Sequence, residues 1–206
     1  MDVTANRVCN WIGFYEYFIQ NADNNLKQMF FSSLSQQYHY LKINYKNVAR
    51  PLEKFNVLKA LIICACAMPR EQTKLGKWVQ DLETLLKTSS HAFNAPFIRS
   101  AKHLVLVVRD LIDINNILKN FYAASFSFIN ETIKTLAPSI RSLRYSDGTL
   151  CDLAGDISLK EIIFARNVFS NALVENILSN INLQNTKKIR EPIGYLKAKG
   201  AKKDVC

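Results

Sequence analysis

The sequence has few of the residues that punctuate β-rich folds: its 206 residues include 6 glycines and 5 prolines. All-β sandwiches and barrels need a turn about every eight to twelve residues, and glycine and proline supply many of these turns. The scarcity of both therefore disfavours an all-β fold and favours helices. With 49% hydrophobic and 21% charged residues, the chain has the composition of a globular protein that can bury a core.

The sequence also lacks a regular cysteine pattern and a long apolar segment. Its 5 cysteines are odd in number and irregularly spaced, which argues against a disulfide framework and for reduced thiols. The longest apolar run, Ala60 to Met68, is too short to cross a bilayer. The first residues do not have the pattern of a signal peptide, so we expect a cytoplasmic protein without a transmembrane segment.

Acidic residues are fewer than basic ones, 17 against 27, which gives a net charge of +10. Half of this excess lies in residues 187–206. Such a segment can contact nucleic acid or anionic lipid, or it can simply be a solvated terminus. Its one aromatic residue is Tyr195, and single-stranded nucleic acids are held largely by stacking on aromatic side chains. We therefore expect residues 184–206 to be a mobile, solvated tail, and nucleic acid is not the expected partner.

Most of the chain before this tail has apolar residues at the three- and four-residue spacing of amphipathic helices. The segments with this pattern are residues 3–20, 26–45, 51–68, 71–87, 98–118, 121–136 and 158–181. Thr4 is the expected N-cap of the first helix. The sixth helix is expected to end before Pro138, which can open one further turn into Arg144. The third helix is apolar on nearly all sides, so we expect it to be central.

The helical pattern stops at residues 140–156. Asp147-Gly148 is a turn dipeptide, because aspartate can bond to the backbone two residues on and glycine accepts positive φ. The residues that follow alternate loosely, which predicts a short turn or strand-like segment near 145–154. The predicted fold class is therefore all-α, with antiparallel helical hairpins over residues 1–183.

Several segments occur in an order that is typical of one enzyme family. They are Arg7-Val8-Cys9-Asn10-Trp11-Ile12, residues 33–41, Leu58-Lys59-Ala60-Leu61 with Ala67-Met68-Pro69, Arg99-Ser100 with Arg109-Asp110-Leu111, and residues 140–155. Together they resemble the α/α-toroid domain of the heparinase II/III family of polysaccharide lyases, in the form found in alphaproteobacteria. The family has further toroid helices before this region and a β-rich half after it. The resemblance therefore implies an incomplete α/α-toroid, similar to a middle fragment of such an enzyme.

The resemblance also implies a groove for acidic polysaccharides that contain uronic acid. The residues that could line this groove are Asn10, Trp11, Gln37, Tyr40, Asn94, Arg99 and Arg144. Gln37 is notable because it lies on an otherwise apolar helical stripe. Asn10 and Trp11 have an alternative role, which is to cap or pack the first helix hairpin.

The catalytic residues of the family are not retained. Elimination of a uronic acid needs a base and an acid that exchange protons near neutral pH. Asn94-Ala95-Pro96 and Tyr145-Ser146 stand where the family has its two histidine motifs. Tyr145 is a weak catalytic candidate, because a tyrosine could act only if a cation lowered its pKa from ~10, and otherwise it is structural. The three histidines have no metal-ligand spacing, so we expect no metal and no cofactor.

We therefore expect a degenerate heparinase II/III-like protein that binds, or once bound, an acidic polysaccharide and does not cleave it as a single chain. Two alternatives stay open. One is a helical interaction module whose exposed apolar helix faces bind a protein partner. The other is one chain of a split lyase, in which a second chain supplies the missing β-rich half.

Overall fold

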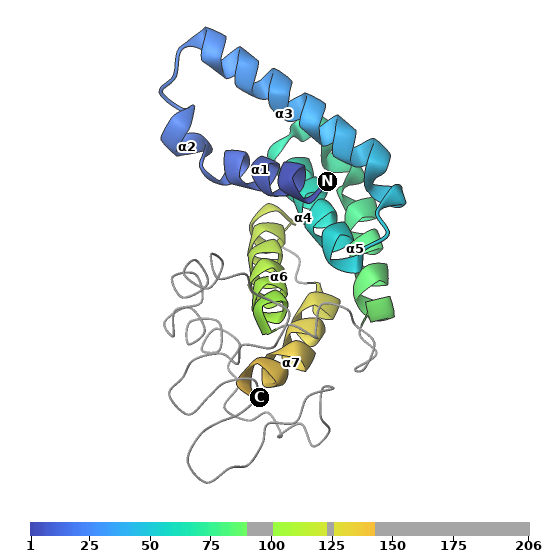
Figure 1. Ribbon diagram of the computed structural model, residues 1–206. Coiled ribbons are helices and arrows are strands. Elements are labelled where there is room, and N and C mark those ends of the chain that lie inside the picture. The colour runs from blue at the N-terminus through green and yellow to red at the C-terminus, as the bar shows by residue number, and fades with distance from the viewer. Residues whose placement is uncertain (90–100, 123–125, 143–206) are drawn as a thin grey trace, which may run out of the picture. The chain divides into compact units, whose positions relative to one another are not determined.

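The computed structural model describes residues 1–89, 101–122 and 126–142. The elements in this part of the chain are α1 (Asp2–Gly13), α2 (Tyr15–Phe18), α3 (Asn24–Asn44), the 3-10 helix η1 (Tyr45–Asn47), α4 (Pro51–Ala67), the 3-10 helix η2 (Pro69–Lys74), α5 (Leu75–Ser89), α6 (Ala101–Tyr122) and α7 (Ser127–Ser142). These residues contain no strand (Figure 1), and the predicted all-α class is confirmed. The toroid arrangement stays a prediction. The expected strand-like segment near 145–154, the helix at 158–181 and the tail at 184–206 lie outside the described residues.

The described helices belong to two compact units. The first contains α1 to α5 and the last turns of α6 from Asn116 onward. The second contains the first part of α6, up to Asn115, and α7. The candidate site described below lies entirely in the first unit.

Helix α4 is the centre of the first unit. Pro51 opens it at a position where the missing backbone N–H has no partner to lose. The helix ends at Ala67, because Met68 precedes Pro69 and adopts an extended conformation, as residues before proline prefer. Every residue from Ala60 to Cys66 is buried, and both α1 and α3 pack against the helix. The expectation of a central third helix is confirmed.

Helix α1 differs from its predicted extent at both ends. It begins at Asp2, with Met1 at the N-cap position, so Thr4 is not the cap and the prediction was wrong. It ends at Gly13 rather than continuing to Gln20, because Phe14 leaves the helical conformation with φ −106° and ψ 18°. Glycine is a poor helix former, which makes this point a natural place for the helix to break. The short α2 follows.

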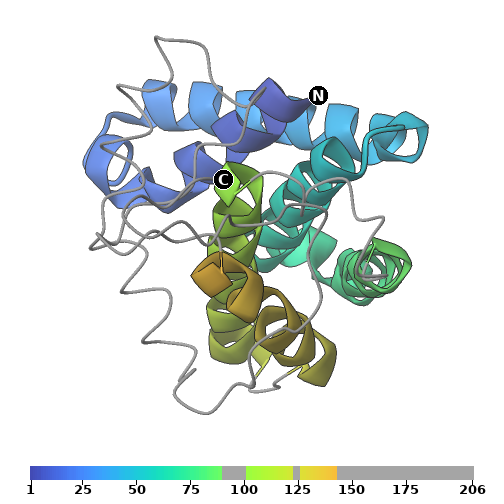
Figure 2. The same cartoon turned by 60° about the horizontal axis from the view of Figure 1, so that its bottom comes forward.

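Helix α3 runs back alongside α1 in the opposite direction (Figures 1 and 2). Its N-cap is Asp23, whose carboxylate accepts a 2.7 Å hydrogen bond from the backbone N–H of Leu26. The buried residues of α3 are Leu34, Tyr38 and Leu41, which lie at the spacing of one helical face. None of its first ten residues is buried, so this part of the helix extends beyond the core.

The fourth predicted helix begins later than expected. Residues 71–74 belong to the 3-10 helix η2, and the α-helical residues begin at Leu75. Helix α5 buries a stripe that consists of Leu75, Trp78, Val79, Leu82 and Leu86. Because η2 is wound more tightly than an α-helix, it turns the chain from the end of α4 into α5.

The second unit contains α7 and the part of α6 up to Asn115. The β-branched run in α6 is helical, as its length predicted. Phe121 and Tyr122 were expected to begin the next helix, but they end α6 instead. The sixth predicted helix was expected to end before Pro138, and this was wrong, because Pro138 lies inside α7. Asn115 donates a 3.0 Å side-chain hydrogen bond to Asn130 and so connects α6 to α7.

Candidate functional site

A polar contact between α1 and α3 brings together residues of two motifs that are thirty positions apart. The Nε of Arg7 donates a hydrogen bond to Oε1 of Gln37 at 2.6 Å. This contact explains why a polar residue interrupts the apolar stripe of α3, since that position faces the guanidinium of α1. Gln37 is thus one of the predicted groove residues that the fold places in a defined contact.

Trp11 belongs to the same cluster because it lies four residues after Arg7, one turn along the same face of α1. The Arg7 Cζ lies 5.9 Å from the centroid of the indole ring, within the range of a cation–π contact. The ring also packs against Phe30 of α3, with centroids 5.5 Å apart. We call Arg7, Trp11 and Gln37 the Arg7 site.

The Arg7 site has donors to offer to an anion. A guanidinium carries five N–H groups, and the hydrogen bond to Gln37 engages the one on Nε. Within the described part of the chain, no hydrogen bond or ion pair involves the two Nη groups, and the residue is exposed. Two adjacent Nη groups can bind a carboxylate or a sulfate in a bidentate manner.

The remaining predicted groove residues divide into two sets. Asn10 and Tyr40 are exposed on α1 and α3, each three residues or fewer from a member of the Arg7 site. The Tyr40 carbonyl accepts a hydrogen bond from the side chain of Asn44 at 2.8 Å. Asn94, Arg99, Arg144 and the catalytic candidate Tyr145 lie outside the described residues.

Arg7 itself was not among the predicted groove residues. Two signals in the sequence pointed to it: it heads the motif that contains Asn10 and Trp11, and it precedes Trp11 by one helical turn. What the sequence does not show is the pairing with Gln37. That pairing depends on the antiparallel packing of α1 on α3.

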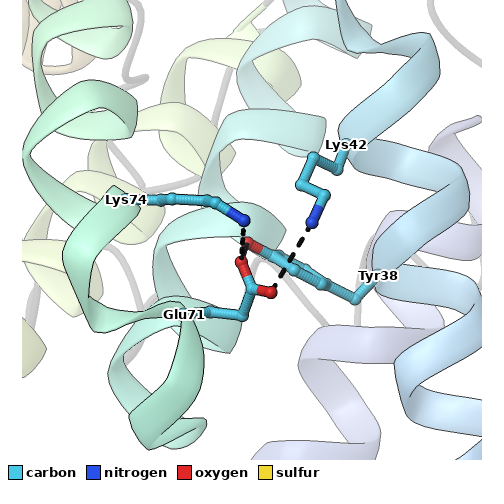
Figure 3. Close-up of polar contacts among 4 residues, drawn as sticks. All are labelled: Tyr38, Lys42, Glu71 and Lys74. Carbon is cyan, nitrogen blue, oxygen red and sulfur yellow. Dashed lines mark hydrogen bonds and ion pairs between the residues drawn. The ribbon is translucent and has the colours of Figure 1, made fainter.

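A second polar cluster connects α3 to η2 around the carboxylate of Glu71 (Figure 3). The Tyr38 hydroxyl donates to Oε2 of Glu71 at 2.8 Å, and the Lys74 Nζ donates to the same oxygen at 2.9 Å. The Lys42 Nζ forms an ion pair with Oε1 at 3.5 Å and lies 5.2 Å from the centroid of the Tyr38 ring. We call these four residues the Glu71 network. It was not predicted.

The ionisation states of the Glu71 network follow from its contacts. Burial raises the pKa of Glu71, but the hydrogen bonds from Lys74 and Tyr38 and the charge of Lys42 outweigh it, so the pKa of this carboxyl is lowered. Burial, together with the hydrogen bond to Glu71, raises the pKa of Tyr38 well above its ordinary value. Burial and the neighbouring Lys74 lower the pKa of Lys42. At neutral pH the network therefore holds a protonated phenol against an ionised carboxylate, which is a structural arrangement and a poor source of a general base.

A second tyrosine, Tyr45, fixes the start of η1, directly after the C-terminal end of α3. The Tyr45 hydroxyl donates to Oδ2 of Asp81 at 2.8 Å, and burial together with this bond raises the pKa of Tyr45 to about 12. Its ring meets Trp78 edge to face with centroids 5.1 Å apart, and the Lys77 Nζ lies 4.9 Å from the centroid of Trp78. These contacts hold the C-terminal part of α3 against α5.

The described residues contain no group of three or more His, Cys, Asp or Glu side chains that could hold a metal ion. Among these same residues, no helix combines the length and the apolar character that crossing a bilayer requires. Comparisons of the chain with protein-family models, with curated proteins and with solved structures found no match. The relation to the heparinase II/III family therefore stays an expectation from the sequence motifs.

Proposed function

We propose that this protein is a helical binding protein for acidic polysaccharides, with a scaffold like that of the heparinase II/III lyases and without cleavage by the single chain. The observation that carries this proposal is the Arg7 site. There, residues from two separate motifs meet, and a guanidinium keeps its two Nη groups available on the surface. The expected ligands are uronate carboxylates and sulfate groups.

The contacts of the Arg7 site explain how it would hold such a ligand. The hydrogen bond to Gln37 and the packing against Trp11 fix the guanidinium from two sides. A guanidinium that is already oriented loses less side-chain entropy when it binds a planar anion. The partly exposed indole provides an apolar surface beside the anion, where the C–H groups of a sugar ring can pack.

Binding without cleavage is consistent with the acid–base groups of the first unit. Lyase chemistry needs a base that is active near neutral pH. Tyr38 and Tyr45 both have a raised pKa, and their hydroxyls donate hydrogen bonds to carboxylates. Both phenols are therefore protonated at neutral pH, and neither is suited to remove a proton from a sugar. A purified sample that released unsaturated uronate from heparin, heparan or alginate would refute this part of the proposal.

The binding proposal can be tested by calorimetry with a defined heparin oligosaccharide. Replacing Arg7 with alanine removes a charged, bidentate contact, and hydrogen bonds to charged groups are worth about 1.5–3 kcal/mol. We expect the affinity of Arg7→Ala to fall at least ~10-fold. The matched control is Arg70→Ala, which removes the same charge from an exposed position on η2 and should change the affinity less than ~2-fold.

Two results would count against the proposal. Equal losses in Arg7→Ala and Arg70→Ala would mean that heparin responds to net charge alone. An unchanged affinity in Arg7→Ala would mean that the polysaccharide binds elsewhere. Because charge-driven binding weakens with salt, each comparison is made at low and at physiological ionic strength.

A further inference from the structure

The end of the α1–α3 hairpin carries a cluster of large apolar side chains that the other helices of the first unit, as far as the structure describes them, leave exposed. We call this cluster the aromatic tip; its members are Phe14, Tyr15, Tyr17, Phe18, Leu26, Met29, Phe30 and Phe31. The exposed fractions of Tyr17, Met29 and Phe18 are 87%, 68% and 67%. Single exposed apolar residues are common on protein surfaces, whereas a contiguous group of this kind marks a site of interaction.

The rings of the aromatic tip pack in two groups of three. Tyr15 lies 5.8 Å, centroid to centroid, from both Phe30 and Phe31, and these two phenylalanines are 5.4 Å apart. Phe18 packs edge to face against Phe14 at 6.3 Å and against Tyr17 at 6.0 Å. Such ring pairs stabilise a fixed arrangement, so the tip presents a formed surface.

The aromatic tip projects away from the core of the first unit. Helix α2 buries none of its residues, and neither do the first ten residues of α3. Figures 1 and 2 both show α2 and the start of α3 at the far end of the hairpin, beyond α4 and α5. The tip is thus a protrusion and not a face that another helix of this unit packs against.

The polar residues around the tip are mostly uncharged. The amides in this segment are Gln20, Asn21, Asn24, Asn25 and Gln28. The charged residues between Phe14 and Phe31 are Glu16, Asp23 and Lys27, and the aspartate is engaged as the N-cap of α3. Moving the tip out of water would therefore desolvate few charges, and desolvation of charge is the main cost of such a transfer.

We propose that the aromatic tip inserts into the interfacial region of an anionic lipid bilayer. Tyrosine, with an apolar ring and a polar end, is enriched at the boundary between headgroups and acyl chains, and exposed phenylalanine, leucine and methionine gain by leaving water. The net charge of +10 draws the protein toward an anionic surface. The tip then adds an apolar contact to this electrostatic attraction.

The charge of the chain also distinguishes this occupant from a second copy. Two chains that each carry +10 repel one another, whereas the same charge favours an anionic bilayer. A lipid surface can in addition adapt to a protruding cluster of rings without a preformed cavity. An acidic protein with a complementary hollow is the remaining alternative, and the experiment below separates the two.

The test measures co-sedimentation of the full chain with vesicles of phosphatidylcholine that contain phosphatidylserine. The tip variant combines Tyr17→Ser, Phe18→Ser and Met29→Ser, three exposed positions whose replacement leaves the core intact. The matched control combines Val3→Ser and Ile43→Ser, two exposed apolar positions that lie near the opposite end of the hairpin. We expect the tip variant to lose at least ~10-fold in partition coefficient and the control to stay within ~2-fold of the wild type.

A second measurement locates the contact. In vesicles with brominated acyl chains, the wild type gives the background from Trp11 and Trp78. A tryptophan introduced as Tyr17→Trp should add quenching above this background, and one introduced as Ile43→Trp should not. Equal partition of the wild type and the tip variant would overturn the proposal, because charge alone would then explain binding. Absence of vesicle binding would overturn it too, as would a dimer in light scattering that the tip variant abolishes. Because the tip variant keeps the Arg7 site, it should retain heparin affinity, so the two proposals fail separately.

Discussion

Single side chains of α3 determine how its two halves differ. Tyr38 lies in its C-terminal half, and Tyr45 is the first residue of η1, directly after the helix. Their hydroxyls donate hydrogen bonds to Glu71 and Asp81. Each phenol buries an apolar ring while its hydroxyl finds a carboxylate acceptor, which avoids the cost of an unpaired buried polar group. In the N-terminal half, Phe30 and Phe31 pack against each other and against Trp11 and Tyr15, with no carboxylate partner among these ring contacts. The C-terminal end of α3 is therefore held by buried polar contacts, and the N-terminal end extends beyond the core with its aromatic rings exposed or half-buried.

The first prediction concerns the carboxylate of Glu71. Its pKa is lowered in the folded state, so its contribution to stability is complete above the unfolded value of about 4.5 and disappears as the pH falls through the folded value. Replacing it with glutamine should reduce the free energy of unfolding by roughly 1 kcal/mol at pH 7. This difference from the wild type should shrink as the pH falls below about 4.5 and through the lowered folded pKa. Urea denaturation across this pH range measures both.

The control for this prediction is Glu83→Gln. Glu83 pairs with Lys87 at 2.7 Å on α5, but the lysine side chain is 72% exposed, and exposed helical pairs contribute about 0.5 kcal/mol or less. A Glu71→Gln difference that stayed constant down to pH 3 would contradict the ionisation state that the contacts imply.

At the scale of elements, the sequence was sufficient for the helices and insufficient for several of their ends. The apolar residues of α4 recur on all sides, so its central place could be read from the sequence. The end of α1 before Phe14 could not be predicted from the sequence, because the apolar periodicity continues from Trp11 through Phe18. Helix propensity and apolar periodicity indicate that a segment is helical and which of its faces is buried. They do not indicate the residue at which the backbone leaves the helix.

Some residues of the candidate site could be named from the sequence, but their contacts across helices could not. Trp11 and Gln37 were identified from the motifs and the structure brings both to Arg7. The Glu71 network was missed because the hydroxyl of Tyr38 meets a carboxylate that lies 33 positions further along the chain. A tyrosine and a lysine four residues apart on α3 form one weak local signal, and nothing local indicates which carboxylate they meet.

The second prediction concerns Pro138 in α7. Proline lacks the N–H that would bond to the carbonyl of Lys134, and inside a helix it costs ~3 kcal/mol relative to alanine. The stiffer unfolded chain returns about 0.4–1 kcal/mol of this. We therefore expect Pro138→Ala to stabilise α7 by roughly 2 kcal/mol, measured as slower hydrogen exchange of the α7 amides.

Thr135→Ala is the control, since it changes an exposed residue of the same helix, whose hydroxyl bonds to the carbonyl of Glu131. It should change the protection of α7 by no more than about 0.5 kcal/mol. Faster exchange in Pro138→Ala would mean that the helix does not pass through this position as a regular α-helix.

At the scale of the whole molecule, the charge of the chain and the surfaces of the first unit act at different distances. The net charge of +10 acts over about a Debye length, roughly 8 Å at physiological salt, and does not distinguish one polyanion from another. The Arg7 site and the aromatic tip act at contact. Under the two proposals, selectivity for a polysaccharide or a bilayer comes from these two surfaces, and the charge raises the affinity for both.

The third prediction separates these contributions. Deleting residues 187–206 removes seven bases and two acids and lowers the net charge from +10 to +5. Heparin affinity at low salt should fall, and so should the slope of log K against log salt concentration, because fewer counterions are released. The ~10-fold effect of Arg7→Ala should persist in the shortened chain, since independent sites contribute additively. Calorimetry on the four proteins of this double-mutant cycle measures both effects, with circular dichroism to verify that each is helical. If Arg7→Ala lost its effect in the shortened chain, the basic segment and not the Arg7 site would be the place where the polysaccharide is held.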